Sequence, residues 1–242
     1  MRNMTKRRRL LMIPSSSQGR LPTGFKEVEW LQGTGTQYCV TDIYPVNDNS
    51  TNFIAVRGNL TVLNKQNSSF TLGTYWRQTS SGSTYSYRYD CRYIYAHQIT
   101  QQSDTYKGLF LIEDTRTNGA AHVTFDFTNY VFPVDVHYEL NKTNVVVNNS
   151  SYNKQTMLAY NSTKPLIIGG TYNTNDDVSV ANTQVRVKSF TVYNVDTLLY
   201  EFVPCYRTSD HKTGFMKITV ADGSTEFFPN QGTDEWIIGP TV

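Results

Sequence analysis

Apolar and polar residues alternate with a period of two along much of this chain. The clearest stretch runs from Val185 to Tyr193 and is rich in Val, Phe, Thr and Tyr. Alternation of this kind predicts a β-strand that buries one face and exposes the other. We therefore expect this segment to be the central strand of an all-β domain.

The alternation in this strand changes phase at its middle. Val187 and the residues before it place apolar side chains on one face, but from Phe190 onward the apolar side chains fall on the other. One extra residue near Lys188 and Ser189 would bring both halves to the same face. We therefore predict a β-bulge at these two residues.

Other segments with the same alternation predict further strands, and no helix is indicated in the last sixty residues. Pro204 is expected to end the strand that follows the central one, because proline cannot donate to a ladder. A hairpin is expected around residues 141–143. One or two strands are expected within Phe25–Thr41, with a tight turn at residues 33–35. The further predicted strands are Asn52–Val62, Ser69–Tyr75, Tyr106–Glu113, His122–Phe127, Val134–Leu140, Asn144–Val147, Leu166–Gly170, Leu198–Phe202 and short returning strands up to Ile238, punctuated by Gly214, Gly223 and Gly232.

Aromatic residues are concentrated between Tyr85 and Tyr95, where every second residue is Tyr or Cys. In one extended strand these side chains would share a face, whereas a turn at residues 89–91 would split them between two paired strands. Such a stripe suits a sugar-binding face, or equally the interior of a sandwich or a subunit interface. The candidate carbohydrate-contacting residues are Trp76, Arg77, Tyr87, Tyr89 and Tyr93.

Both ends of the chain carry motifs that resemble a known family. The segments VKSFTVYN, EFVPCYRTSD and FFPNQGTDEWIIGP near the C-terminus, and LPTGFKEVEWLQGTGTQYCVTDIYP from Leu21 to Pro45, are similar to laminin G-like domains of the concanavalin A-like lectin and glucanase superfamily. The form is the one common in tailed bacteriophages and gut bacteria. Cys39 and Val40, and His211 and Lys212, depart from its usual pattern.

The resemblance implies an all-β, two-sheet antiparallel β-sandwich of the concanavalin A-like jelly-roll type. With the alternation, we expect roughly a dozen strands and no helix longer than two turns. The family includes sugar binders, hydrolases and structural modules, so the fold alone does not select a function. The residues expected to be mainly buried are Val28, Trp30, Phe125, Val187, Phe190, Val192, Phe202 and Trp236.

Composition adds a flexible N-terminal arm to this picture. The length of 242 residues suits one sandwich domain, predicted to span residues 21–242. Residues 1–20 carry six of the 22 basic residues and no acid, which leaves 16 basic and 20 acidic residues, a net −4, on the rest. We interpret residues 1–20 as a basic and apolar docking arm with a Ser/Gly linker.

The arm is predicted to dock on another protein, although an unstructured start without a partner is the alternative. Its docking residues would be a basic cluster followed by an apolar pair: Lys6, Arg7, Arg8, Arg9, Leu10 and Leu11. A nucleic-acid partner would need such a basic cluster, but the acidic body disfavours it. No membrane partner is expected, because no apolar stretch approaches the ~18 residues of a span, and Leu10–Ile13 is too short for a signal peptide.

Enzymatic chemistry is not expected from this sequence. Glucanases of the superfamily place catalytic carboxylates about 5 to 5.5 Å apart in an alternating motif, but here only Glu27 and Glu29 match and the third carboxylate is missing. No cofactor is expected. Calcium ligands at residues 47–49 or 176–177 are a weaker interpretation than solvated turns, and the three cysteines are expected to be buried free thiols.

These observations predict a non-catalytic bacteriophage virion protein, a head fibre, decoration or tail-associated subunit. Its localisation would be the virion, its partners other virion proteins contacted by the arm, and its display domain would bind host-surface carbohydrate. Several arms acting together favour a homo-oligomer, with a trimer expected by analogy with phage fibres. The alternatives are a secreted or surface-associated bacterial carbohydrate-binding protein and, more weakly, a glycoside hydrolase.

Overall fold

The computed structural model describes the chain from residue 19 onward with several gaps, and every element in it is a β-strand. The described residues are 19–48, 51–64, 69–80, 83–92, 107–114, 121–126, 130–142, 144–148, 150–153, 160–172, 177–180 and 182–242. Within these ranges there are 21 strands and no helix. The number exceeds the expected dozen because many strands have only two to four residues. The described part contains no helix long and apolar enough to span a membrane.

The first sheet is antiparallel and has β17 (Asn182–Asn194) between β5 (Ile54–Val62) and β18 (Thr197–Arg207). The strands beyond β5 form the predicted hairpin and its continuation, and those beyond β18 form a second hairpin. The outer strands are β10 (Val134–Leu140), β11 (Asn144–Val147) and β12 (Ser150–Asn153) on one side, and β19 (Thr213–Thr219) and β20 (Thr225–Pro229) on the other.

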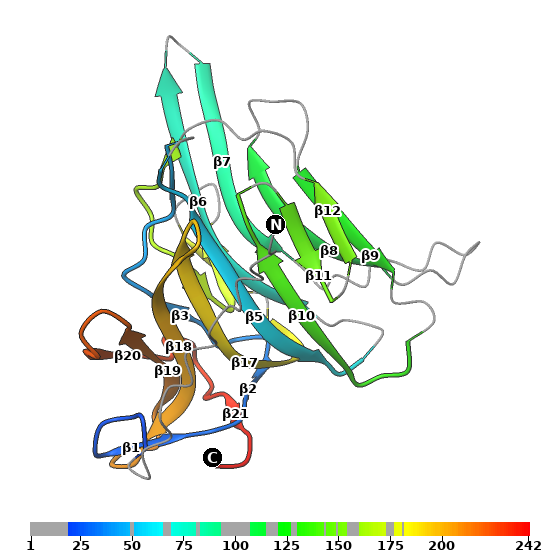
Figure 1. Ribbon diagram of the computed structural model, residues 1–242. Coiled ribbons are helices and arrows are strands. Elements are labelled where there is room, and N and C mark those ends of the chain that lie inside the picture. The colour runs from blue at the N-terminus through cyan, green and yellow to red at the C-terminus, as the bar shows by residue number, and fades with distance from the viewer. Residues whose placement is uncertain are drawn as a thin grey trace, which may run out of the picture.

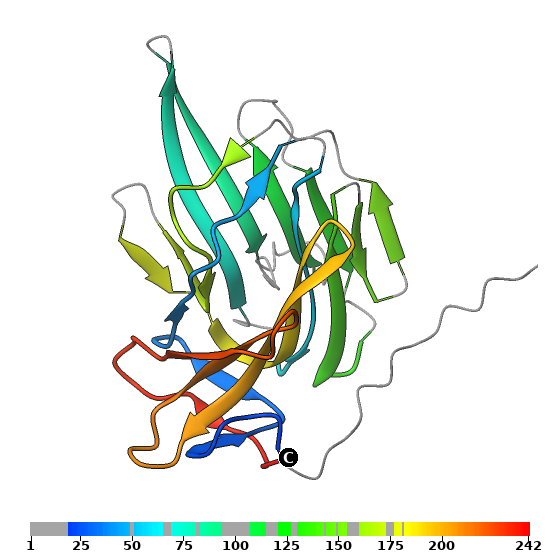
Figure 2. The same ribbon diagram turned by 60° about the vertical axis from the view of Figure 1, so that its left-hand side comes forward.

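The second sheet is built on the long hairpin of β6 (Ser69–Ser80) and β7 (Ser83–Arg92). Its other strands are β8 (Lys107–Asp114), β9 (Ala121–Asp126), β14 (Ile167–Ile168), β3 (Cys39–Val40), β15 (Gly170–Tyr172) and β16 (Val178–Val180). β4 (Val46–Asn47) and β13 (Tyr160–Asn161) pair separately. The two sheets pack together as a β-sandwich, which confirms the predicted all-β sandwich architecture, and the β6–β7 hairpin extends beyond them (Figures 1 and 2).

The predicted bulge in β17 is present. The register against β5 passes from Val187 opposite Leu60 to Phe190 opposite Gly58, so two residues, Lys188 and Ser189, face the single residue Asn59. The extra residue restores the phase of the alternation. As predicted, the apolar side chains on both sides of the bulge are buried: Val185, Val187, Phe190 and Val192.

Pro204 does not end β18, contrary to expectation. The strand continues to Arg207, and Pro204 stands opposite Phe215 of β19. Its carbonyl accepts a hydrogen bond from the backbone N–H of Val28 at 3.0 Å, on the side away from β19. A strand residue directs its N–H and C=O to the same side, so the missing N–H leaves the β18–β19 ladder intact.

The core lies between the two sheets and is rich in aromatic side chains. Phe190 of β17 stacks on Phe202 of β18 with ring centroids 4.7 Å apart. Val28, Phe202 and Trp236 are buried as predicted. Trp30 is only half-buried, because it is covered by the Arg186 guanidinium at 4.2 Å from its ring and not by the core. The side chain of Phe125 lies outside the described set.

The two chain ends close the sandwich at the end opposite the tip of the β6–β7 hairpin. β17 and β18 pair only as far as Phe190 and Phe202, and beyond this point β1 (Phe25–Glu27) pairs with β18 while β2 (Leu31–Thr34) pairs with β17. β21 (Ile237–Ile238) completes this edge against β2. β1 and the C-terminus are at the lower end in Figures 1 and 2, and the end of β6 and the start of β7 are at the upper end.

Candidate functional site

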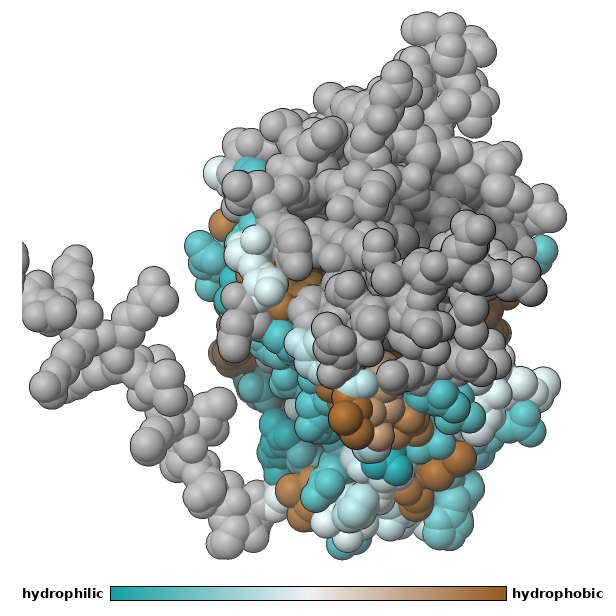
Figure 3. Space-filling model, turned by 90° about the vertical axis from the view of Figure 1, so that its right-hand side faces the viewer, coloured by the Kyte–Doolittle hydropathy of each residue, from teal (hydrophilic) through white to brown (hydrophobic). Residues whose placement is uncertain are grey.

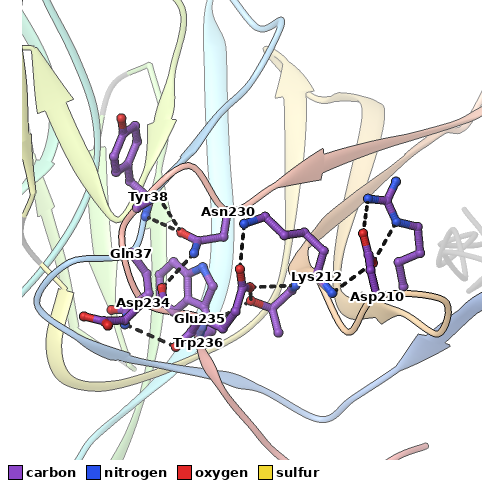
Figure 4. Close-up of polar contacts among 11 residues, drawn as sticks. Gln37, Tyr38, Asp210, Lys212, Asn230, Asp234, Glu235 and Trp236 are labelled. Carbon is purple, nitrogen blue, oxygen red and sulfur yellow. Dashed lines mark hydrogen bonds and ion pairs between the residues drawn. The ribbon is translucent and has the colours of Figure 1, made fainter.

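The two motifs that carry the family resemblance contact each other in a buried polar cluster, which we call the clasp. It joins residues 34–38 to residues 230–236 (Figure 4). The Gln37 side chain is fully buried, and its Oε1 accepts hydrogen bonds from the backbone N–H of Thr34 at 2.9 Å and of Thr36 at 3.3 Å. Its Nε2 donates to Thr34 Oγ1 at 2.7 Å and to the Glu235 carbonyl at 3.3 Å. Gln37 therefore organises its own turn and also holds the C-terminal segment.

Asn230 does the same from the C-terminal side of the clasp. Its Oδ1 accepts hydrogen bonds from the backbone N–H of Tyr38 at 3.1 Å and of Gly232 at 3.0 Å. Its Nδ2 donates to the Asp234 carbonyl at 2.7 Å. A Cβ added to Gly232 would lie 1.9 Å from the carbonyl oxygen of Thr36, so the two segments approach too closely for any other residue.

Glu235 links the clasp to β19. One carboxylate oxygen accepts from the Thr213 backbone N–H at 2.8 Å and from the Thr213 hydroxyl, and the other is 2.7 Å from Lys212 Nζ. Partial burial raises the pKa of Glu235, but the hydrogen bonds from Lys212 and Thr213 outweigh it and the net pKa is lowered. The clasp side chains bind backbone groups and hydroxyls of the two end segments and of β19, which makes this cluster a structural closure of the fold.

A solvent-facing depression on the first sheet, which we call the outer groove, is the other polar feature. It consists of two adjoining hollows of about 340 and 330 Å³ that share Asn59 and Ser189 in their linings. The first hollow extends to Tyr193 and Glu201, and the second extends to Val242 near the C-terminus. The groove thus crosses the sheet at the bulge in β17.

One wall of the outer groove is made by charged residues of β5 and β10. His137 is 3.1 Å from Asn59 Oδ1 through Nδ1 and 3.1 Å from Glu139 Oε1 through Nε2. Arg57 donates to Asn141 Oδ1 at 3.1 Å, and its guanidinium lies 4.2 Å from the ring centroid of Tyr193. Burial raises the pKa of Glu139, but hydrogen bonds from His137 and Asn141 lower it more, so this carboxylate stays ionised at neutral pH.

The opposite wall is made by an ion-pair network at the start of the described chain. Arg20 donates to both carboxylate oxygens of Glu27, at 2.8 and 2.5 Å, and lies 3.3 Å from Glu201. Arg20, which we assigned to the linker, is therefore held against both β1 and β18 by these contacts. Hydrogen bonding to Glu27 raises the pKa of Arg20 further above its ordinary value.

The predicted carbohydrate-contacting residues lie on the β6–β7 hairpin where the structure describes them. β7 runs unbroken from Ser83 to Arg92, so the alternative of a turn at residues 89–91 is wrong. Trp76 stands opposite Tyr87, and Tyr89 opposite Thr74, whereas Arg77 is opposite Ser86. The register therefore brings Trp76 and Tyr87 together on neighbouring strands. Tyr93, like the predicted docking residues Lys6, Arg7, Arg8, Arg9, Leu10 and Leu11, lies outside the described residues.

The carboxylates weighed for catalysis and calcium binding have other contacts. Glu27 and Glu29 both line the outer groove, and Glu27 pairs with Arg20. Asp48 accepts hydrogen bonds from the backbone N–H groups of Thr51 at 2.9 Å and Asn52 at 2.8 Å, the pattern of a capped turn. No group of three metal-ligating side chains occurs among the described residues.

Cys39 and Cys205 are buried free thiols, as expected from the sequence. Burial raises the pKa of Cys205 to about 12 and raises that of Cys39 as well, so both stay protonated and poorly reactive at neutral pH. The side chain of Cys91 lies outside the described set. These thiols therefore serve as small apolar core groups.

Sequence reasoning did not find the outer groove. Its residues come from β1, β5, β10, β17, β18, the segments on either side of β1 and the C-terminus, and no local pattern in the sequence brings them together. Two signals pointed toward it: the phase change at Lys188 and Ser189, because bulges often occur beside functional sites, and the carboxylate pair Glu27 and Glu29. Comparison of the chain with family models, with curated proteins and with solved structures found no match.

Proposed function

We propose that this protein is a non-catalytic structural subunit of a bacteriophage virion, a head fibre, decoration or tail-associated protein. Residues 1–20 anchor it to other virion proteins, and residues 21–242 form the display domain. The observation that carries this proposal is the position of the segment that joins the arm to the domain, from Arg20 to β1, which we call the chain entry. The chain entry is at one end of the sandwich, and the end of β6 and the start of β7 are at the other (Figures 1 and 2).

The ion pairs of Arg20 with Glu27 and Glu201 support an anchoring role for the segment before it. They hold the chain against β1 and β18, so that a force on the arm would reach the sheet directly. One arm with a few charge contacts and apolar side chains binds weakly, but several arms in a homo-oligomer act at high effective concentration. A trimer is our expectation by analogy with phage fibres.

The β6–β7 hairpin is the part of this domain that we propose to meet host-surface carbohydrate. Aromatic rings bind the apolar faces of sugars, while amides and guanidinium groups bind their hydroxyls. Trp76 and Tyr87 are register partners four residues from the hairpin turn, which supports a joint role. The alternative to sugar binding is that these two aromatic residues belong to the sandwich interior or to a subunit interface.

Deleting residues 2–13 tests the anchoring role. We expect the truncated protein to fold with a nearly unchanged melting temperature, because Arg20 and the domain remain, but to be absent from purified particles. Replacing Lys6–Arg9 with alanine should have the same effect, whereas Arg2→Ala is the matched control with one basic residue removed outside the cluster. Normal incorporation of the truncated protein would overturn the docking role.

A bacterial carbohydrate-binding protein is the alternative, and a glycoside hydrolase is the weaker one. The observation in favour of the hydrolase is that Glu27 and Glu29 both line the outer groove. Against it, Glu27 is ion-paired with Arg20. The gene neighbourhood separates these readings, because capsid, portal and tail genes would support the virion subunit and polysaccharide-utilisation genes the alternatives.

A further inference from the structure

The outer groove has a floor of small polar side chains between two walls of longer ones. Asn59, Ser189 and Thr191 line the groove along its middle. The bulge places both Lys188 and Ser189 opposite Asn59, which widens β17 at this point. The walls are the His137–Glu139–Arg57 group on one side and the Arg20–Glu27–Glu201 group on the other. A trough of this form accepts an extended ligand lying across the strands.

The wall residues are accessible to a ligand. The side chains of His137 and Arg20 are 42% and 46% exposed, and that of Lys188 is 34% exposed. The two ring nitrogens of His137 already lie within hydrogen-bond distance of Asn59 Oδ1 and Glu139 Oε1, which holds the ring between them. The polar groups are thus both reachable and held in place, which lowers the entropy cost of binding.

The charges of the groove argue against a polyanion. Its lining has three basic residues, Arg20, Arg57 and Lys188, and four acidic ones, Glu27, Glu29, Glu139 and Glu201, so these seven side chains sum to −1. Nucleic acids and other polyanions need an excess of basic groups. A near-neutral lining of donors and acceptors instead suits a ligand with many uncharged hydroxyls.

The strand pairing argues against a peptide. β5 is paired on both sides, by β17 and β10, and the part of β17 after the bulge is paired by β5 and β18. The floor therefore presents no unpaired sheet edge to which a peptide could add as a strand. Side-chain hydroxyls, amides, carboxylates and guanidinium groups are the contacts on offer, and these are the groups that bind sugar hydroxyls.

We propose that the outer groove binds a neutral oligosaccharide, with Asn59, His137 and Arg57 contacting its hydroxyls and Ser189 beneath it. The proposal rests on the glycan-displaying function above but assigns a site separate from the β6–β7 hairpin. Tyr193, whose ring carries the Arg57 guanidinium, forms one end of the site. Val242 lines the other hollow, together with Glu27, Val28 and Glu29.

The test is direct titration of the full chain with neutral hexasaccharides: maltohexaose, cellohexaose, laminarihexaose and chitohexaose, followed by a glycan array. Ser189→Tyr fills the junction of the two hollows at an exposed position. We expect it to weaken binding of the best probe at least about tenfold, that is by about 1.4 kcal/mol. Asn59→Ala, which removes a floor contact without adding bulk, should also weaken binding.

Ser179→Tyr is the matched control, an exposed serine on the strand β16 outside the groove, and it should bind like the unaltered protein. Thermal unfolding followed by circular dichroism first checks that each variant has the melting temperature of the unaltered protein, and only such variants are compared in binding. Unchanged binding in Ser189→Tyr and Asn59→Ala, with loss in Trp76→Ala and Tyr87→Ala, would overturn the groove and leave the hairpin site standing. No binding to any probe or array glycan would overturn both sugar sites, but the particle-incorporation result would still decide the virion function separately.

Discussion

At the scale of single residues, close approach explains why particular side chains are needed in the clasp. Gln37 and Asn230 each form hydrogen bonds to both of the end segments. Their partners are backbone groups and, for Gln37, the Thr34 hydroxyl. A buried amide that lost its partners would leave several polar groups unsatisfied, at about 1–3 kcal/mol each. The glycines of the clasp serve a different purpose, because they let the backbones of the two segments touch.

Gly232→Ala should destabilise the protein by about 1–3 kcal/mol, the usual cost of overpacking. Its Cβ would stand 1.9 Å from the Thr36 carbonyl oxygen, and the clasp holds the backbone of both residues in place. Gly19→Ala is the control, because no atom lies within 4 Å of its Cβ. Urea unfolding followed by tryptophan fluorescence measures both, and equal midpoints would contradict the tight approach.

At the scale of the elements, the bulge lets one strand serve both halves of the first sheet. β17 pairs with β5 along its length, with β18 after the bulge and with β2 before it. Without the extra residue one half of the strand would turn its apolar side chains to solvent. The same irregularity shapes the floor of the outer groove, so sheet packing and the proposed site depend on one local feature.

Deleting Ser189 should therefore disrupt folding far more than altering its side chain. The shortened strand must expose either Val185 and Val187 or Phe190 and Val192, which are all buried. Each buried side chain of this size contributes about 1.5–3 kcal/mol. Ser189→Ala, which keeps the strand length, should change the free energy of unfolding by less than about 0.5 kcal/mol. A deletion variant that unfolds cooperatively at the original midpoint would refute the role of the bulge.

At the scale of the whole molecule, the described carboxylates and thiols with shifted pKa values fall into two sets, the carboxylates near the surface and the thiols in the core. On the face shown in Figure 3, hydrophobic residues occur in small separate groups among hydrophilic ones. Among the five described carboxylates with lowered pKa, Asp135, Glu139 and Glu235 link neighbouring strands or chain segments at the surface, and Asp210 and Asp222 lie in exposed turns. The thiols with raised pKa, Cys39 and Cys205, are inside.

Stability should accordingly form a plateau in pH with two limbs. A carboxyl with a lowered folded-state pKa stabilises the fold above its unfolded value, about 4.3 for Glu, and this is lost as pH falls. A thiol with a raised pKa stabilises the fold fully below its unfolded value, about 8.5, and this is lost as pH rises. Melting temperature measured from pH 3 to 10 should fall at both ends.

Two variants test which groups produce the acid and the alkaline limb of this pH profile. Glu235→Gln should flatten the acid limb, because the ion pair with Lys212 is then absent at every pH. Cys205→Ala should flatten the alkaline limb while costing some core packing at neutral pH. Limbs of unchanged slope in both variants would show that other groups control the pH dependence.

The sequence alone determined the fold class, the position of most strands and the bulge at Lys188 and Ser189, because period-two alternation is a local property of the chain. It also singled out the two end motifs, because both resemble segments of the same family of domains. Only the tertiary structure decided that Gln37 and Asn230 bind across the two ends, that Pro204 is tolerated where β18 passes from β17 to β1, and that Trp30 is covered by Arg186. It alone assembled Arg20, Arg57 and His137 around one groove. These contacts join residues far apart in the chain, and they depend on strand order and register, which hydrophobic periodicity does not encode.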